Sequence, residues 1–230
     1  MYIVTGVSRG LGKGIVEALL AKKKAVMGIG RSNPFGNDIQ FLECDLGDAA
    51  AIKALKFPMF EGEVTLINNA GVIGEIKRIS EQVTSDLEHV MQVNVFAPMT
   101  LTRKLYASLE KDQSFVLVNI SSGAANRSIP SWSAYCASKA ALNRLTENFY
   151  LEEMERNQEV RAYAVAPGVI DTGMQVEIRS AAADDFSQKD NFVQLKEEGK
   201  LFSPEEAAHR LIQLLEKPFS GDVFQDLRNV

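Results

Sequence analysis

The sequence is poor in the residues that bind metals or form disulfides. Its 230 residues include two cysteines and two histidines. Cys44 and Cys136 lack the spacing of a zinc site, and His89 and His209 are each isolated from other ligand-type residues. We therefore expect two reduced, packed cysteines and no metal centre.

Clusters of positive charge and long apolar runs are also scarce. The net charge is −5 and Lys and Arg form no long block, which argues against a nucleic-acid partner but is compatible with a small basic pocket. No apolar run reaches the roughly 18 residues that span a bilayer. The opening "MYIVTG" lacks the basic and apolar regions of a signal peptide. We expect a cytoplasmic protein with no membrane partner.

Short β-branched runs alternate with longer amphipathic ones, which is typical of an α/β protein with a parallel sheet. No Pro/Gly/Ser-rich linker divides the chain, so we expect a single domain over 1–230. A first helix is predicted from Gly10 to about Lys23. The predicted strands are 2–5, 25–29, 39–43, 64–67, 114–120, 160–165 and 222–225.

One polar, helix-prone segment, 171–202, is too long for a plain connection between elements. It directly follows the sixth predicted strand. Because ligands of open α/β sheets lie beyond the carboxyl ends of the strands, we interpret this segment as a substrate lid. A surface decoration is the alternative.

The first predicted strand leads into "TGVSRGLG", which places Gly6, Gly10 and Gly12 before a helix. Glycines there permit a tight turn and a close approach of the backbone to a pyrophosphate, while the helix N-terminus offers free N–H groups. The position of this motif, after the first strand of an alternating pattern, predicts a dinucleotide site.

The end of the second predicted strand indicates which dinucleotide binds. An NAD site usually has an Asp or Glu there to bind the ribose hydroxyls. This chain has Gly30 and Arg31 instead, and Arg9 supplies a second guanidinium suited to a phosphate. The pair favours NADP(H), unless both arginines are plain surface charges.

Tyr135 and Lys139 are four residues apart, which places them on one face of a predicted helix. A neighbouring ammonium lowers the pKa of a phenol, so we expect the pair to exchange a proton with a substrate oxygen. Ser122, at the end of the preceding strand, would hydrogen-bond the same oxygen. Such a spacing is often only a surface pair, but the context "SAYCASKAAL" is poor in charge.

A proline supplies a further feature, because Pro98 has no N–H to donate to the carbonyl of Asn94 four residues earlier. That carbonyl is then free to hold a water that connects Lys139 to solvent as a proton relay. A plain proline kink is the alternative.

Six motifs together resemble the short-chain dehydrogenase/reductase family of the single-domain type. They are T-G-x-x-x-G-x-G from Thr5, "NNAG" at 68–71, Asn94, Ser122, Tyr135 with Lys139, and "PG" at 167–168 followed by Thr172. The resemblance implies a doubly wound, seven-stranded Rossmann sheet. It also implies that Tyr135 is the acid-base, that Lys139 holds the nicotinamide ribose and lowers the tyrosine pKa, that Ser122 orients the carbonyl, and that Asn94 belongs to the relay.

The resemblance implies a set of cofactor contacts as well. The residues that match family positions for the pyrophosphate, the NADP(H) phosphate, the adenine, the ribose and the nicotinamide are Thr5, Gly6, Ser8, Arg9, Gly10, Leu11, Gly12, Arg31, Ser32, Asp45, Leu46, Asn69, Ala70, Gly71, Tyr135, Lys139, Pro167, Gly168, Val169 and Thr172.

Within the family, "PGVIDTGMQVEIR" and the C-terminal "LKEEGKLFSPEEAAHRLIQLLEKPFSGD" are similar to the sepiapterin reductase and benzil reductase branch. The chain has Gly173 where that branch has an aspartate. It has Gln225 where pterin reductases place the aspartate that fixes the pterin, with Asp226 one residue later. A shift of one residue turns a strand side chain to the other face, so Asp226 is a poor substitute.

We interpret the chain as an NADPH-dependent carbonyl reductase that transfers a hydride to a ketone or vicinal diketone, with Tyr135 as proton donor. The alternatives are an oxidative alcohol dehydrogenase of the same family and a non-enzymatic NADP(H)-binding sensor. Trp132, Met174 and residues of the segment 171–202 are expected to form the substrate wall, although Trp132 is almost equally compatible with core filling. The helices near 84–107 and 133–156 are apolar on more than one side, so we expect a homodimer or homotetramer.

Overall fold

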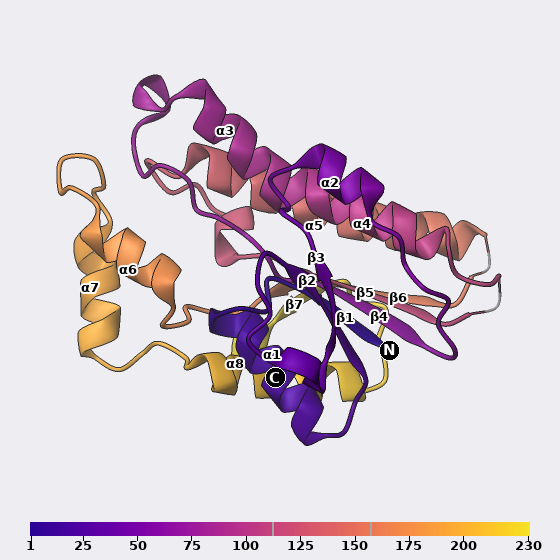
Figure 1. Ribbon diagram of the computed structural model, residues 1–230. Helices are drawn as coiled ribbons and strands as arrows, with labels where there is room; N and C mark the ends of the chain where they lie inside the picture. Colours follow the sequence, from indigo (N-terminus) through magenta and orange to yellow (C-terminus); the bar gives the residue numbers. More distant parts are fainter. Residues whose placement is uncertain (112, 157) are drawn as a thin grey trace.

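A seven-stranded parallel sheet forms the centre of the computed structural model, which describes residues 1–111, 113–156 and 158–230. The strand order is β3-β2-β1-β4-β5-β6-β7, so the chain crosses over once between its two halves, and helices cover both faces (Figure 1). This confirms the predicted doubly wound sheet. The strands are β1 Tyr2–Thr5, β2 Val26–Gly30, β3 Gln40–Glu43, β4 Val64–Asn68, β5 Phe115–Ile120, β6 Val160–Ala166 and β7 Phe224–Asp226.

All seven predicted strands are present, and the last one is displaced. We predicted 222–225, whereas β7 covers Phe224–Asp226. The reason is a turn at Asp222, whose carboxylate accepts a hydrogen bond from the Phe224 N–H and whose carbonyl accepts one from the Gln225 side chain.

The helices are α1 Gly10–Ala21, α2 Ala49–Ala54, α3 Thr84–Met91, α4 Ala97–Tyr106, α5 Ser133–Glu155, α6 Gly173–Ser180, α7 Lys189–Glu197 and α8 Pro204–Glu216. A π-helical segment, Gln92–Phe96, joins α3 to α4. The short 3-10 turns are Gly36–Asp38, Ile79–Glu81, Gly123–Ala125 and Leu227–Asn229. None of the helices in the described part of the chain is both long enough and apolar enough to cross a bilayer.

Two apolar layers hold the sheet. The strands β4 and β5 are buried along their whole length, as parallel strands covered on both faces must be. One layer joins the sheet to α1 and α8, and the other joins it to α2, α4 and part of α5 (Figure 1). The helix α8 begins with a capped turn, in which Ser203 accepts a hydrogen bond from the Glu206 N–H at 3.1 Å and Pro204 occupies the first turn.

The segment 171–202 extends from the carboxyl edge of the sheet and contains α6 and α7 (Figure 1). Its two ends lie side by side, because Ile170 and Phe202 form an isolated parallel bridge. The Phe202 N–H donates to the Val169 carbonyl and the Asp171 N–H donates to the Phe202 carbonyl, each at 2.9 Å. The segment is therefore fastened to the body at a narrow base.

Candidate active site

The end of β5 lies against the first turns of α5, and this brings Ser122, Tyr135 and Lys139 together. Tyr135 and Lys139 are buried, with the Lys139 Nζ atom 5.7 Å from the centroid of the Tyr135 ring. Lys139 Nζ donates a hydrogen bond to the Ile120 carbonyl at 2.8 Å. Ser122 caps the short turn Gly123–Ala125 by accepting a hydrogen bond from the Ala124 N–H at 3.1 Å.

Burial sets the charge state of this pair. It raises the pKa of Tyr135 to about 12, and the neighbouring Ser122 side chain acts in the opposite direction. Burial also lowers the pKa of Lys139 to about 8. We expected the ammonium to lower the phenol pKa, but the net shift is upward, because burial is its largest cause. Tyr135 therefore stays protonated at neutral pH.

Asn94 lies in the π-helical segment and its side chain is held from both ends. Its Nδ2 donates to the Val72 carbonyl at 2.8 Å and to Ser138 Oγ at 3.0 Å, and its Oδ1 accepts from the Val72 N–H at 2.9 Å. Ser138 Oγ donates in turn to the Tyr135 carbonyl at 2.8 Å. Asn94 thus ties the loop after β4 to the helix that carries Tyr135. Sequence analysis missed Ser138, which lies on the same stretch as Tyr135 and Lys139.

Pro98 lies in the first turn of α4, inside a helical run that continues from α3 through the π-helical segment. Its missing N–H leaves a carbonyl of the preceding turn without that helix bond, which is compatible with the predicted free carbonyl of Asn94. The irregularity falls just before it, in the π-helical turns around Asn94. Such turns are frequent at functional sites.

The glycine-rich loop after β1 is a close-packed cradle. Gly6 and Gly10 have φ angles of +71° and +55°, which disfavour a side chain. A Cβ atom on Gly12 would lie 2.2 Å from the Gly6 carbonyl oxygen and 2.4 Å from Asn69 Nδ2. Thr5, at the end of β1, joins this loop to the loop after β4. Its Oγ1 accepts hydrogen bonds from the Asn69 and Ala70 N–H groups at 3.0 Å each.

The other predicted cofactor positions from β4 and β6 lie at the same edge. A Cβ on Gly71 would be 3.4 Å from Lys139 Nζ, and one on Gly10 would be 3.2 Å from the Thr172 methyl group. Gly168, between Pro167 and Val169, has a φ of +79°. The first turn of α1 contains no acidic residue. A glycine-rich turn beside a helix start without a side-chain cap fits the pyrophosphate of a dinucleotide.

The residues predicted to bind the adenosine end follow β2 and β3, which pair Gly30 with Glu43. Arg31 and Ser32 are exposed immediately after β2. Asp45 accepts a hydrogen bond from the Gly47 N–H at 2.8 Å, and this turn presents the buried Leu46 beside it.

Two more predicted positions flank the glycine-rich loop. Ser8 is exposed, and Leu11 is a buried residue of the first turn of α1. Arg9, also exposed, extends toward the start of α6, with Nη1 3.7 Å from the position of a Cβ on Gly173.

The predicted substrate residues Trp132 and Met174 belong to a third apolar cluster that includes Tyr135. The segment 171–202 contributes two phenylalanines to this cluster, which are its only aromatic residues before Phe202. The expectation that this segment supplies wall residues does not single them out. The ring centroids of Phe186 and Phe192 lie 5.4 Å and 5.3 Å from that of Trp132. The buried members are Ile73, Ala124, Ile129, Trp132, Tyr135, Ile178, Phe186 and Phe192.

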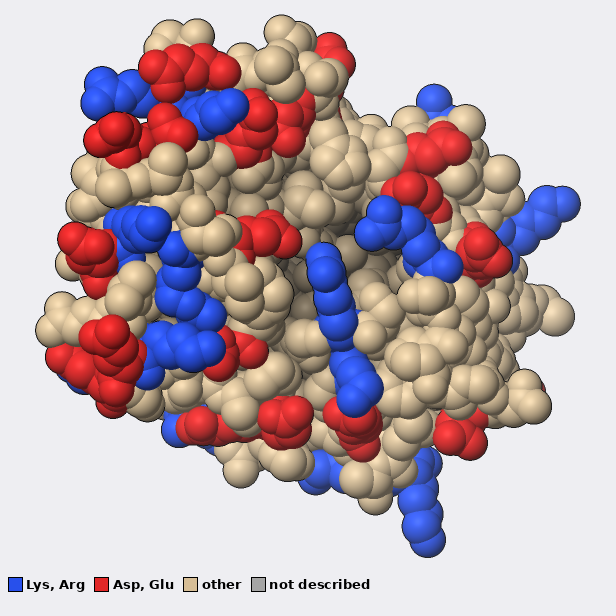
Figure 2. All heavy atoms as spheres, turned by 60° about the vertical axis from the view of Figure 1, so that its left-hand side comes forward, with Lys and Arg blue, Asp and Glu red and all other residues tan. Residues whose placement is uncertain are grey.

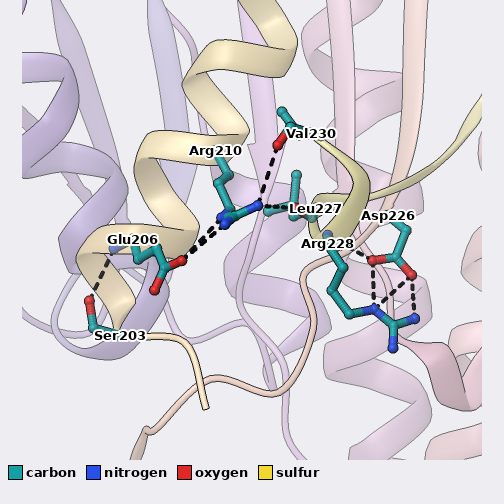
Figure 3. A network of polar contacts seen from close by, with 7 residues as sticks. All are labelled: Ser203, Glu206, Arg210, Asp226, Leu227, Arg228 and Val230. Carbon is teal, nitrogen blue, oxygen red and sulfur yellow. Dashed lines mark hydrogen bonds and ion pairs between the residues drawn. The ribbon is translucent and has the colours of Figure 1, made fainter. Parts of the chain in front are cut away.

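The C-terminal residues hold Asp226 in an ion pair (Figure 3). Its carboxylate accepts two hydrogen bonds from Arg228 Nε, at 2.9 Å and 3.1 Å, and a third from Arg228 Nη2. Arg228 lowers the pKa of the Asp226 carboxyl. Arg210 fastens the chain end by donating to the carbonyls of Leu227 and Val230. Asp226 is therefore already paired with a cation of its own chain.

The face at which the strands end is hollowed near its middle, and Lys and Arg side chains lie beside the hollow (Figure 2). Within the described ranges, no three His, Cys, Asp or Glu side chains are grouped closely enough to hold a metal ion. The site thus combines a concave edge, positive charge, a glycine cradle and a protonated phenol.

Comparison with known proteins gives a consistent result. A family model described as short chain dehydrogenase matches residues 1–183. The benzil reductase ((S)-benzoin forming) of Bacillus cereus is 36% identical over 231 residues, covering 93% of this chain and 93% of that protein. Its namesake from Bacillus subtilis (strain 168) is 34% identical over 241 residues, covering 99% and 98%. A sepiapterin reductase of Xenopus tropicalis is 28% identical over 242 residues, covering 94% and 91%.

The fold comparison agrees. The crystal structure of the short chain dehydrogenase/reductase YIR035C from Saccharomyces cerevisiae superposes with a TM-score of 0.82 at 29% identity, covering 98% of this chain and 95% of that one. The resemblance drawn from the sequence motifs, including the branch, is confirmed.

Proposed function

The chain belongs to the short-chain dehydrogenase family, and from this premise we propose that it is an NADPH-dependent reductase of ketones and vicinal diketones such as benzil. Oxidoreduction at a carbonyl or alcohol group with a nicotinamide cofactor is common to the family. The finer assignment is supported by the benzil reductase relatives and by the apolar cluster around Trp132.

The direction of the reaction is inferred from the relatives, two of which are benzil reductases. A phenol that donates a proton to a carbonyl oxygen must be protonated beforehand, and burial raises the pKa of Tyr135 to about 12. An unshifted phenol would also be protonated at neutral pH, so it is the relatives, and not the pKa, that favour reduction over the oxidative alternative.

The cradle from Thr5 to Gly12, with Asn69–Gly71 and Pro167–Thr172, would hold the cofactor, which supplies the hydride when bound. Arg31 would bind the 2′-phosphate of NADPH, because it follows Gly30 directly and no carboxylate stands at that position to repel the phosphate. Arg9 is the second proposed phosphate ligand, from the glycine-rich loop.

Side chains of the protein would bind the substrate carbonyl oxygen and supply its proton. Ser122 and Tyr135 would donate hydrogen bonds to the carbonyl oxygen of the substrate and so polarise the bond. As the carbon gains a hydride, the Tyr135 O–H bond breaks and its proton passes to the oxygen, which yields the alcohol and a phenolate. The Lys139 ammonium, 5.7 Å from the ring centroid, stabilises that phenolate. Reprotonation would pass through Lys139 and a water on the Asn94 carbonyl.

The segment 171–202 is proposed as the lid of this site, because its phenylalanines lie against Trp132 while its base is a single bridge. The active form is proposed to be a homodimer or homotetramer. Exposed apolar side chains support this assembly. Phe96 lies just before α4, Met99 lies on α4, and Leu151 and Met154 lie on α5.

The test is NADPH oxidation, followed by absorbance, with benzil and with sepiapterin. We expect turnover of benzil, and a loss of roughly 10²- to 10⁴-fold in kcat for Tyr135→Phe. Tyr150→Phe, a matched change at the far end of α5, should retain activity. Inertness of the wild-type protein toward benzil, or full turnover by Tyr135→Phe, would overturn the proposal.

A further inference from the structure

The buried indole of Trp132 has an unused hydrogen-bond donor. The side chain is 5% exposed, and nothing in 1–111, 113–156 or 158–230 accepts a hydrogen bond from its Nε1. Buried Trp N–H groups usually find a partner, and leaving one unpaired costs about 1–3 kcal/mol. An acceptor supplied by a ligand would remove this cost.

The apolar neighbours of the indole point to the kind of ligand. Apart from Trp132 itself, Tyr135 is the one buried member of this cluster whose side chain has a polar atom. Phe186 lies nearly parallel to the indole, at 12°, and Phe192 is tilted by 35°. The lid thus places two phenyl rings against the indole, in an environment suited to aryl groups.

The position of Trp132 relative to the reacting group restricts the ligand further. Trp132 precedes Tyr135 by three residues at the start of α5, and the two rings meet edge to face with centroids 5.6 Å apart. A molecule whose carbonyl oxygen reached Tyr135 would have its adjacent carbon on the side of the indole. An oxygen on that carbon would then be a candidate acceptor for Nε1.

We propose that Trp132 Nε1 binds a second oxygen, on the carbon adjacent to the reacting carbonyl, and so selects aryl-substituted 1,2-dicarbonyl substrates. The inference rests on the proposed reductase function and deepens it. Trp132 would be a specificity-determining residue that touches the substrate, in addition to forming the pocket wall.

Substrate pairs test this directly. Deoxybenzoin has the two phenyl rings of benzil but a CH2 group in place of the second carbonyl. Trp132→Phe retains an aromatic ring and removes the N–H. We expect it to lower kcat/KM at least about 10-fold for benzil and less than about 2-fold for deoxybenzoin, since a lost hydrogen bond is equivalent to about 1.4 kcal/mol or more. Equal losses for both ketones, or no loss, would overturn the proposal.

A binding measurement separates this inference from the reductase assignment. Trp132 is the single tryptophan of the chain, so its indole N–H gives one cross peak in a 1H–15N spectrum. With NADP+, which has no hydride to give, benzil should shift this proton downfield relative to deoxybenzoin, which controls for ring currents. Phe186→Leu should leave that difference intact.

The activity assay and the indole spectrum test the two proposals separately. Absence of ketone reduction by the wild-type protein, with the benzil-specific indole shift present, would overturn the reductase assignment alone. Equal shifts with both ketones, or none, would overturn the role of the indole.

Discussion

Lys139 donates a 2.8 Å hydrogen bond from its buried ammonium to the carbonyl of Ile120, the last residue of β5. The lysine is thereby anchored to the sheet while its charge lies over the Tyr135 ring. Burial of this charge lowers the pKa of Lys139 to about 8 from 10.5. Folding is thus coupled to proton release at this position.

The sign of that coupling predicts a pH effect on stability. Between pH 8 and 10.5 the unfolded lysine keeps its proton while the folded one loses it, so the free energy of unfolding contributed by Lys139 rises with pH. Relative to Lys139→Met, the wild-type protein should gain roughly 1–2 kcal/mol between pH 8 and pH 9.5. Urea titrations of both proteins at these pH values measure the difference.

Surface Lys24→Met serves as the control for this experiment and should run parallel to the wild-type protein. A Lys139→Met curve that also runs parallel would show that the buried lysine keeps its proton throughout this range.

A second prediction concerns the cofactor preference. Removal of the guanidinium in Arg31→Ala should lower kcat/KM for NADPH roughly 10- to 100-fold, because charge-assisted hydrogen bonds to a phosphate contribute about 1.5–3 kcal/mol. The value for NADH should change less than about 3-fold. Steady-state kinetics with both cofactors provide the measurement. Lys24→Ala makes an equal change in net charge on a remote surface and should leave kcat/KM unchanged with both cofactors. Equal losses of kcat/KM with NADPH and NADH in Arg31→Ala would contradict the NADP(H) assignment.

The sheet and the glycine cradle were predictable because local signals determine them. Buried parallel strands are largely apolar, as β5 is, and Gly6, Gly10 and Gly12 stand around the start of α1 at the spacing typical of a pyrophosphate site. Tyr135, Lys139 and Ser122 follow similarly from their places after one strand and on one helix.

Other features depend on long-range packing that the sequence does not display. The pKa of Tyr135 is set by burial, which a spacing of four residues does not reveal. Phe186 and Phe192 contact Trp132 only because segment 171–202 folds back over the site, more than 50 positions along the chain. The π-helical turn around Asn94 depends on bonds to Val72 and Ser138, which come from separate elements.

The last prediction concerns assembly. Leu151 on α5 is 51% exposed, and Phe96 and Met154 are exposed to a similar extent. Exposed large apolar side chains are costly in water, and burial against a second copy would stabilise them by about 25 cal/mol per Å². A glutamate at one of these positions would place a charge in that contact, where it has no partner.

We therefore expect a wild-type dimer or tetramer in light scattering after size exclusion, and a predominantly monomeric Leu151→Glu protein at micromolar concentration. Val176→Glu supplies the matched control, because Val176 is 58% exposed and lies on α6, away from α4 and α5. Circular dichroism should show all three proteins folded. A wild-type monomer, or an unchanged mass for Leu151→Glu, would contradict the assignment of this face, whereas dissociation caused by Val176→Glu would move the interface to the segment 171–202.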